Sequence, residues 1–200
     1  MENNKIKYLK LSSLFISLFI CFSCLNDTTE RIERHYPSGK RYMVLYKKNG
    51  KTEGVSTLYY ESGKTRLVQR FSTGLLQGKQ QSYHLNGQLK SELTYLDNIM
   101  TGPYKIFRRD GSLQVEGNNF NGRDAGVKKF YYATGQLKGR TYIENNQSNG
   151  PFIEYRINGK KKVAGSQRDS KLDGIITYYD SLSYDSTRLF FTNGRFVKKL

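Results

Sequence analysis

The sequence predicts an all-β protein: an elongated, single-layer antiparallel β-meander of seven 24-residue repeats, preceded by a signal peptide. Three observations predict this fold. Glycine recurs at a constant interval of 24 residues, a second glycine follows each of these at a fixed distance, and an aromatic residue recurs between the two. A constant period of roughly 20–50 residues is typical of repeat proteins, in which each unit packs only against its neighbours.

The chain opens with the features of an export signal. Lys5, Lys7 and Lys10 form a positively charged segment, and the apolar run from Leu11 to Phe22 follows it. Spanning a bilayer core of about 30 Å takes about 20 apolar residues, which is more than this run provides. The pattern therefore favours a cleaved signal peptide over a transmembrane helix.

The apolar run ends in ICFSC, with Ser23 directly before Cys24. This ending resembles the lipobox of bacterial lipoproteins, in which the cysteine is diacylated and becomes the mature N-terminus. The resemblance implies a signal peptide at 1–23, a lipid on Cys24, a linker at 24–29 and anchoring in the cell envelope, on the periplasmic or surface side of the outer membrane. The alternative is ordinary cleavage nearby, which leaves Cys24 as a free thiol.

The counts of cysteine and charge limit both the stabilising chemistry and the partners. The mature chain would keep one cysteine, so we expect no disulfide within the chain. Lys and Arg number 33 against 17 Asp and Glu, and removing residues 1–23 leaves 30 against 16, a net charge of +14. This excess favours anionic lipid head groups, surface glycans or an acidic protein, whereas export argues against nucleic acid.

Each repeat predicts two strands and two turns. Positions are counted from 0 at the unit start, and the units begin at residues 30, 54, 78, 102, 126, 150 and 174. Glycine stands at position 9 of every unit except the last, after Ser, Asn, Asp or Thr, and such pairs mark hairpin turns. A second turn signal, such as Asn121-Gly122, stands at positions 19 and 20. The repeat domain therefore covers 30–197, with about 14 strands, and leaves a tail at 198–200.

An aromatic residue occupies position 5 of six units, and His35 takes that position in the first unit. The six are Tyr59, Tyr83, Phe107, Tyr131, Tyr155 and Tyr179. They form a candidate aromatic interaction face, for a sugar, another protein or a second copy of the chain. The alternative is that they pack between units.

The strand after the first turn alternates in polarity, which predicts two unlike faces. Leu89 and Leu113 stand at position 11, whereas Arg66 and Lys90 stand at position 12. A two-residue turn would pair position 5 with position 12, among the cations. A three-residue loop with a left-handed glycine bulge pairs it with position 11. We predict the second register, with the leucines of positions 11, 13 and 15 beside the aromatics and the basic row opposite, because it gathers more apolar area on one face.

Three stretches carry a resemblance to a known repeat family: GVSTLYYESGKTRLVQRFSTG, GKQQSYHLNGQLKSELTYLDN and GVKKFYYATGQLKGRTYIENN. They resemble MORN-variant repeats, which are rich in glycine and tyrosine, and the resemblance covers residues 30–197. Bacterial proteins of this type are often catalogued as YwqK-family antitoxins, so the resemblance implies a component of a toxin–antitoxin system. The last unit, YYDSLSYDSTRLFF, departs from the pattern as expected of a capping repeat.

A basic ladder is the candidate anion-binding site. It consists of Lys64, Arg66, Lys90, Lys138, Lys160 and Lys162, at positions 10 and 12. A linear anion, such as a glycan, would meet several of these cations on one face. The alternative is that the cations keep an open sheet soluble and discourage pairing at its edges.

Residues for catalysis or metal binding are scarce. The two histidines, His35 and His84, occupy positions 5 and 6, where we expect a structural role. Glu92 and Glu116 share position 14, about 10 Å apart, and their basic neighbours favour charge balance over catalysis. We therefore expect no catalytic residue, no metal and no cofactor.

The function expected from the sequence is that of a non-enzymatic repeat lipoprotein, acting as a protein-interaction scaffold at the bacterial envelope. Its protein partner is not identified by the residues, and a homodimer through the aromatic face is a further expectation. The alternative is an envelope- or anion-binding module that uses the basic ladder.

Overall fold

The computed structural model describes residues 28–183 and 185–200. Within these residues the chain forms one open antiparallel sheet of 20 strands, which confirms the predicted all-β meander. The described part holds no helix that could cross a membrane. The predicted signal peptide at 1–23 and the predicted lipid site at Cys24 lie outside the described residues.

The strands are of two kinds. The longer ones are β1 (Thr29–His35), β2 (Arg41–Lys48), β4 (Gly54–Tyr59), β5 (Thr65–Ser72), β7 (Gly78–Tyr83), β8 (Leu89–Leu96), β10 (Gly102–Phe107), β11 (Leu113–Phe120), β13 (Gly126–Tyr131), β14 (Leu137–Glu144), β15 (Gln147–Tyr155), β16 (Lys161–Arg168), β18 (Gly174–Tyr179), β19 (Ser186–Thr192) and β20 (Arg195–Lys199). The two-residue strands are β3 (Lys51–Thr52), β6 (Leu75–Leu76), β9 (Ile99–Met100), β12 (Arg123–Asp124) and β17 (Lys171–Leu172).

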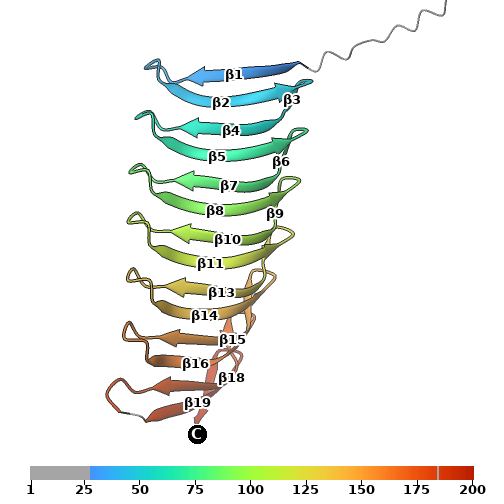
Figure 1. Ribbon diagram of the computed structural model, residues 1–200. Helices are drawn as coiled ribbons and strands as arrows, with labels where there is room; N and C mark the ends of the chain where they lie inside the picture. Colours follow the sequence, from blue (N-terminus) through green and yellow to red (C-terminus); the bar gives the residue numbers. More distant parts are fainter. Residues whose placement is uncertain (1–27, 184) are drawn as a thin grey trace, which may run out of the picture.

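The strands follow one another through the sheet in chain order (Figure 1). Within a unit the two long strands form a hairpin, as β4 does with β5. The second strand of each unit then pairs with the long strand that opens the next, as β5 does with β7 and β11 with β13. The first turns therefore stack along one edge of an elongated sheet, and the second turns stack along the other (Figure 1).

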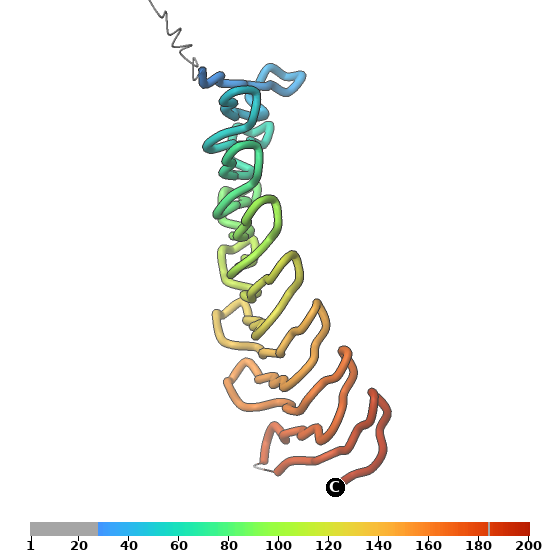
Figure 2. Tube along the Cα trace, turned by 90° about the vertical axis from the view of Figure 1, so that its right-hand side faces the viewer, coloured from blue at the N-terminus to red at the C-terminus, as the bar shows by residue number. Residues whose placement is uncertain are grey.

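The sheet has more strands than predicted because the glycine at the unit start interrupts a strand. Gly54 and Gly126 adopt φ of 74° and 80°, a left-handed conformation that residues with a side chain rarely adopt. Just before Gly78, the amide of Gln77 donates to Arg70 O at 2.8 Å. This bulge separates β6 from β7 and bends the unit, so that the chain follows a loop in each unit rather than a flat ribbon (Figure 2).

The first turn has the register predicted from the sequence. Tyr59 pairs with Thr65, position 5 with position 11. A bulge follows at once, because Leu58 pairs with Leu67, position 4 with position 13. Adjacent residues of a strand point to opposite faces, so Leu67 and Tyr59 lie on different faces. The prediction that the leucines of positions 13 and 15 lie beside the aromatics is therefore wrong, because the bulge reverses the alternation beyond position 11.

The two sides of the sheet differ in burial. We call one side the tyrosine face; it carries positions 1, 3, 5, 14 and 16. The other is the core face, with positions 2, 4, 13, 15 and 17 and the short strand's position 22. Buried side chains of the core face are Ser56, Leu76, Tyr104, Asn119, Ile143, Val163 and Ile176. Val44 is buried on the tyrosine face. The buried residues form only a narrow strip, so hydrogen bonds between units are needed to stabilise the stack as well.

Hydrogen bonds from the side chain at position 6 join each unit to the next. Tyr60 Oη donates to Tyr83 O at 2.7 Å, and Tyr132 Oη reaches Tyr155 O at 2.7 Å. The residues that bond this carbonyl of the following unit are Tyr36, Tyr60, His84, Arg108, Tyr132 and Arg156. At the second turns, the amide at position 20 donates to the carbonyl at position 22 of the preceding unit, at 2.8–3.2 Å. Two ladders of hydrogen bonds therefore hold the stack.

Candidate interaction surface

The basic ladder lies along the first turns. Lys64, Lys90 and Lys160 are exposed, and none of them forms an ion pair within residues 28–183 and 185–200. Gln114 takes position 12 in the fourth unit and interrupts the row of cations. The structure therefore places a broken row of cations at this edge, with a gap at its centre.

The other three cations of the ladder contact groups of the chain. Arg66 lies 5.6 Å from the ring centroid of Tyr42. Lys138 Nζ lies 5.9 Å from the ring centroid of Tyr132, and Lys162 Nζ lies 3.1 Å from a Glu154 carboxylate oxygen. Because Glu154 belongs to the core face, Lys162 reaches the side opposite the aromatic row. Three of the six ladder cations are therefore already engaged by groups of the chain.

The six aromatic residues at position 5 lie on the tyrosine face, each of them half-buried. The Arg41 guanidinium lies 5.7 Å from the ring centroid of Tyr59. Tyr131 Oη donates to Glu116 Oε1 at 2.8 Å, and burial together with this hydrogen bond raises the pKa of Tyr131 to about 12. Neighbouring units thus cover part of the aromatic row, so it is not a free platform along its whole length.

Carboxylates of the tyrosine face lie against cations in the first, third and fourth units, whereas the second unit has no Asp or Glu at positions 1, 3, 5, 14 or 16. In the first unit, Glu33 accepts a hydrogen bond from Arg41 Nε at 2.6 Å and pairs with Arg31 at 2.5 Å. These bonds, led by the one from Arg41, lower the pKa of Glu33 to about 2. The charges of both arginines are thereby paired with a carboxylate of their own unit.

Glu92 and Glu116 are balanced in the same way. Glu92 lies 3.1 Å from Lys79 Nζ, and Glu116 lies 2.9 Å from Lys129 Nζ. The lysine hydrogen bond is the main cause that lowers the pKa of each carboxyl group. A general acid needs its pKa raised instead. The geometry of the two glutamates therefore fits charge balance.

This alternation of charge ends at the fifth unit. Positions 3 and 14 form one row across the tyrosine face, in which Lys105 stands between Glu92 and Glu116. After Lys129 the row reads Arg140, Ile153, Ala164, Thr177 and Arg188. Neither arginine forms an ion pair in the described part of the chain. Arg140 and Arg188 are therefore two cations of this row that no carboxylate within residues 28–183 and 185–200 neutralises.

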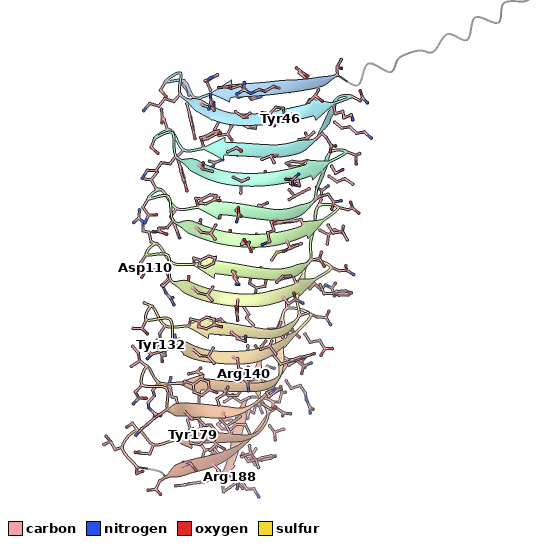
Figure 3. All side chains as sticks on the ribbon, viewed as in Figure 1. Tyr46, Asp110, Tyr132, Arg140, Tyr179 and Arg188 are labelled. Atoms are coloured by element: carbon pink, nitrogen blue, oxygen red, sulfur yellow. The ribbon has the colours of Figure 1, made fainter. Side chains whose placement is uncertain are left out.

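Exposed apolar side chains share the tyrosine face with these arginines, and Val127 and Tyr142 border the same depression as Arg140. Val127 is 48% exposed, Tyr142 is 42% exposed and Ile175 is 41% exposed. Figure 3 shows Arg140 and Arg188 along the same part of the stack, between the turns of the two edges. We call this surface the C-terminal patch, and it consists of Val127, Arg140, Tyr142, Pro151, Ile153, Ala164, Ile175 and Arg188. A depression of about 450 Å³ lies over β13–β16 within it.

The core face has a groove of about 530 Å³ that extends from the fifth to the seventh unit. It opens where Gly139 stands at position 13 and Ser148 at position 22, positions that carry Leu67 and Leu76 in the second unit. Its lining includes the rings of Phe130, Phe152 and Tyr178. The described residues contain no group of His, Cys, Asp and Glu side chains that could hold a metal ion.

Two structural features of this surface and its scaffold were not predicted from the sequence. The hydrogen-bond ladder at position 6 was signalled by the tyrosine pairs Tyr59-Tyr60 and Tyr131-Tyr132, in which the second residue of each pair is the donor. The C-terminal patch was signalled by the loss of acidic residues from positions 3 and 14 after Glu116. Both signals are visible only when the same position is compared across units.

Comparisons with known proteins match two stretches of the repeat domain. Residues 76–97 and 126–145 match the family described as MORN repeat variant. These stretches cover most of the third and fifth units, and they support a MORN-repeat family. No curated protein matches the sequence. A solved structure described as "Crystal structure of GtfA/B complex bound to UDP and GlcNAc" is similar over 57% of this chain and 22% of that chain, at 12% identity and a TM-score of 0.26.

Proposed function

We propose that the protein is a non-enzymatic repeat protein that acts as a protein-interaction scaffold at the bacterial envelope, where a lipid on Cys24 anchors it. The observation that carries this proposal is the C-terminal patch. Its exposed apolar residues, Val127, Tyr142 and Ile175, lie together with two unpaired arginines. Grouped apolar residues on a protein surface mark interaction sites, and aromatic residues and arginine are enriched where proteins meet.

The stacked repeats support the same function. Both hydrogen-bond ladders fix each unit on its neighbour, so the strands from β13 to β19 hold the patch on a continuous sheet. A surface that is ordered before binding loses less conformational entropy when the partner docks. The resemblance to YwqK-family antitoxins extends the proposal: the partner would then be a toxin met outside the cytoplasm.

Site-specific photo-crosslinking in the native cell tests the proposal. A benzophenone amino acid replaces Tyr142 in the patch or, as the control, Leu85, which is 50% exposed in a first turn. We expect a discrete adduct from position 142 and none from position 85. An adduct of twice the chain's mass would identify a second copy as the occupant. Equal labelling from both positions, or none from either, would count against a scaffold that works through this patch.

A second candidate function is binding of anionic lipid head groups or glycans by the basic ladder. It is favoured by the absence of an ion pair at Lys64, Lys90 and Lys160 in the described residues. Exposed charges interact over about 8 Å at physiological salt and less at higher salt. Binding to vesicles with anionic lipid, or to an anionic polysaccharide, should therefore weaken steeply as salt rises.

Charge reversal identifies the surface responsible. Changing Lys64, Lys90 and Lys160 to Glu should abolish this binding. The control variant reverses three exposed cations of β20, Arg195, Lys198 and Lys199, and should retain most of it. Binding that ignores salt, or that both variants lose equally, rules out a specific role for the ladder.

A further inference from the structure

We infer that the C-terminal patch binds an acidic segment of a partner protein, which places carboxylates on Arg140 and Arg188 and an apolar side chain in the depression between Val127, Tyr142 and Ala164. The inference rests on the proposed scaffold function and adds the chemistry of the partner. It is argued from the charges that the chain balances by itself and from those that it leaves unbalanced.

The first step is the contrast along the tyrosine face. Cations of the first units have carboxylate partners there, as Arg41 has Glu33 and Lys79 has Glu92. The unit that starts at 54 lacks Asp and Glu at positions 1, 3, 5, 14 and 16 singly, whereas the units that start at 126, 150 and 174 are three consecutive units without them. A carboxylate from another molecule would complete the pattern. Arginine suits this role because its planar guanidinium binds a carboxylate through two parallel hydrogen bonds.

The second step is the spacing of the two arginines. Both stand at position 14, Arg140 on β14 and Arg188 on β19, and the strands β15, β16 and β18 lie between them. Four steps of about 4.8 Å separate them by about 19 Å. An extended peptide that rises about 3.3 Å per residue covers this distance in about six residues. The partner segment should therefore carry acidic residues about six positions apart.

The third step is the apolar anchor. The depression of about 450 Å³ lies beside Arg140 and is bordered by Pro151, Ile153 and Ala164. The small side chain of Ala164 leaves room that larger residues around it do not fill. A bulky apolar residue enclosed by such a border, next to an arginine, is the usual arrangement at the energetic centre of a protein interface.

A second copy of the chain fits the patch poorly. A symmetric dimer places the same surface of both copies in contact. The patch has no carboxylate to offer, so such a dimer would bring the Arg140 and Arg188 guanidiniums of two copies together without compensation. Like charges that face each other across an interface repel and disfavour that partner. An acidic partner avoids this repulsion.

Peptide selection on the full-length chain tests the inference. A phage library of random 12-residue peptides is selected on the protein, and the enriched peptides are synthesised and titrated. We expect enrichment of Asp and Glu in pairs about six residues apart, with Leu, Phe or Tyr between them. Changing both arginines, in the variant Arg140→Glu/Arg188→Glu, should weaken binding of the synthetic peptides at least tenfold. The charge-matched control Lys51→Glu/Arg109→Glu, at two exposed cations outside both the patch and the basic ladder, should stay within twofold.

Three outcomes would overturn the inference: enrichment of neutral or basic peptides, acidic peptides that the arginine variant binds as well as the native chain, or no enrichment. The crosslinking experiment separates this failure from failure of the scaffold function. A crosslinked partner at position 142 without an acidic segment removes the inference alone. Acidic peptides bound at the patch, with no crosslinked partner in cells, remove the scaffold function alone.

Discussion

Replacing Gly165 by Ala should destabilise the sheet at its most deeply buried point. A Cβ on Gly165 would lie 2.4 Å from Ile176 Cδ1 and 3.0 Å from Ile175 O. Ile176 is fully buried, at 0% exposure, and the carbonyl belongs to the backbone of β18, so neither group moves freely. Gly165 has no left-handed φ, so the cost comes from crowding alone.

The magnitude follows from two opposed effects. Overpacking a close-packed interior costs about 1–3 kcal/mol, whereas replacing a strand glycine recovers about 0.5–1 kcal/mol. We expect a net loss of about 1–2 kcal/mol, which lowers the thermal midpoint by a few degrees, roughly 2–8 °C for a domain of this size.

A double-mutant cycle isolates the cause. Ile176→Val removes the Cδ1 atom and alone costs about 0.5–1.5 kcal/mol. The variant that combines it with Gly165→Ala should lose less stability than the sum of the two single losses, by at least about 0.5 kcal/mol. Urea unfolding followed by circular dichroism gives all four free energies, and Ser166→Ala on the same strand should stay within about 0.5 kcal/mol of the native chain. A Gly165→Ala protein as stable as the native chain, or strict additivity, would refute the reasoning.

Three further predictions concern a hydrogen bond between units, the backbone angle of a unit-start glycine and the ion pairs of Glu33. Tyr60→Phe removes the hydrogen bond to Tyr83 O and should lower the free energy of unfolding by about 0.5–1.5 kcal/mol. The control Tyr155→Phe breaks no such bond and should leave the urea midpoint nearly unchanged. Gly54→Ala should cost about 1–2 kcal/mol although no atom lies within 4 Å of the added Cβ, because its φ is +74°, and Gly54→Asn should cost less in the same urea assay. The pKa of Glu33 is lowered from 4.5 to about 2, so its ion pairs stabilise the fold above pH 4.5 and lose that effect as the pH falls towards 2. The difference in urea midpoint between the native chain and Glu33→Gln should therefore disappear over that interval, and a difference independent of pH contradicts the assignment.

The register could be predicted because it depends on local turn chemistry. The glycine at position 9, such as Gly63 with φ of 85°, allows one loop geometry, and that loop fixes position 5 opposite position 11. The division of the strands could not be predicted from the same evidence. A glycine such as Gly78 is compatible with a turn, a strand end or a bulge, and only the pairing of β6 and β7 with β5 decides among them.

The candidate surface was less predictable than the fold. The ladder cations were found from their period, but the contacts of Arg66 with Tyr42 and of Lys162 with Glu154 depend on rotamers and on the bulge. The unpaired state of Arg140 depends on residues one strand away on each side, Lys129 and Ile153. Sequence periodicity places residues on faces, whereas the charge balance of an arginine on a face depends on its neighbours on adjacent strands.

The hydrogen bonds from position 6 allow whole units to be added to the sheet or removed from it. Their donor is a tyrosine, a histidine or an arginine in different units, and their acceptor is always a backbone carbonyl. The junction between units therefore does not depend on one particular side-chain pair. Removing or adding one unit would change the reach of the sheet by about 10 Å, two strand spacings, while the remaining junctions keep their geometry. The number of units thus sets the distance between the C-terminal patch and the N-terminal end of the sheet.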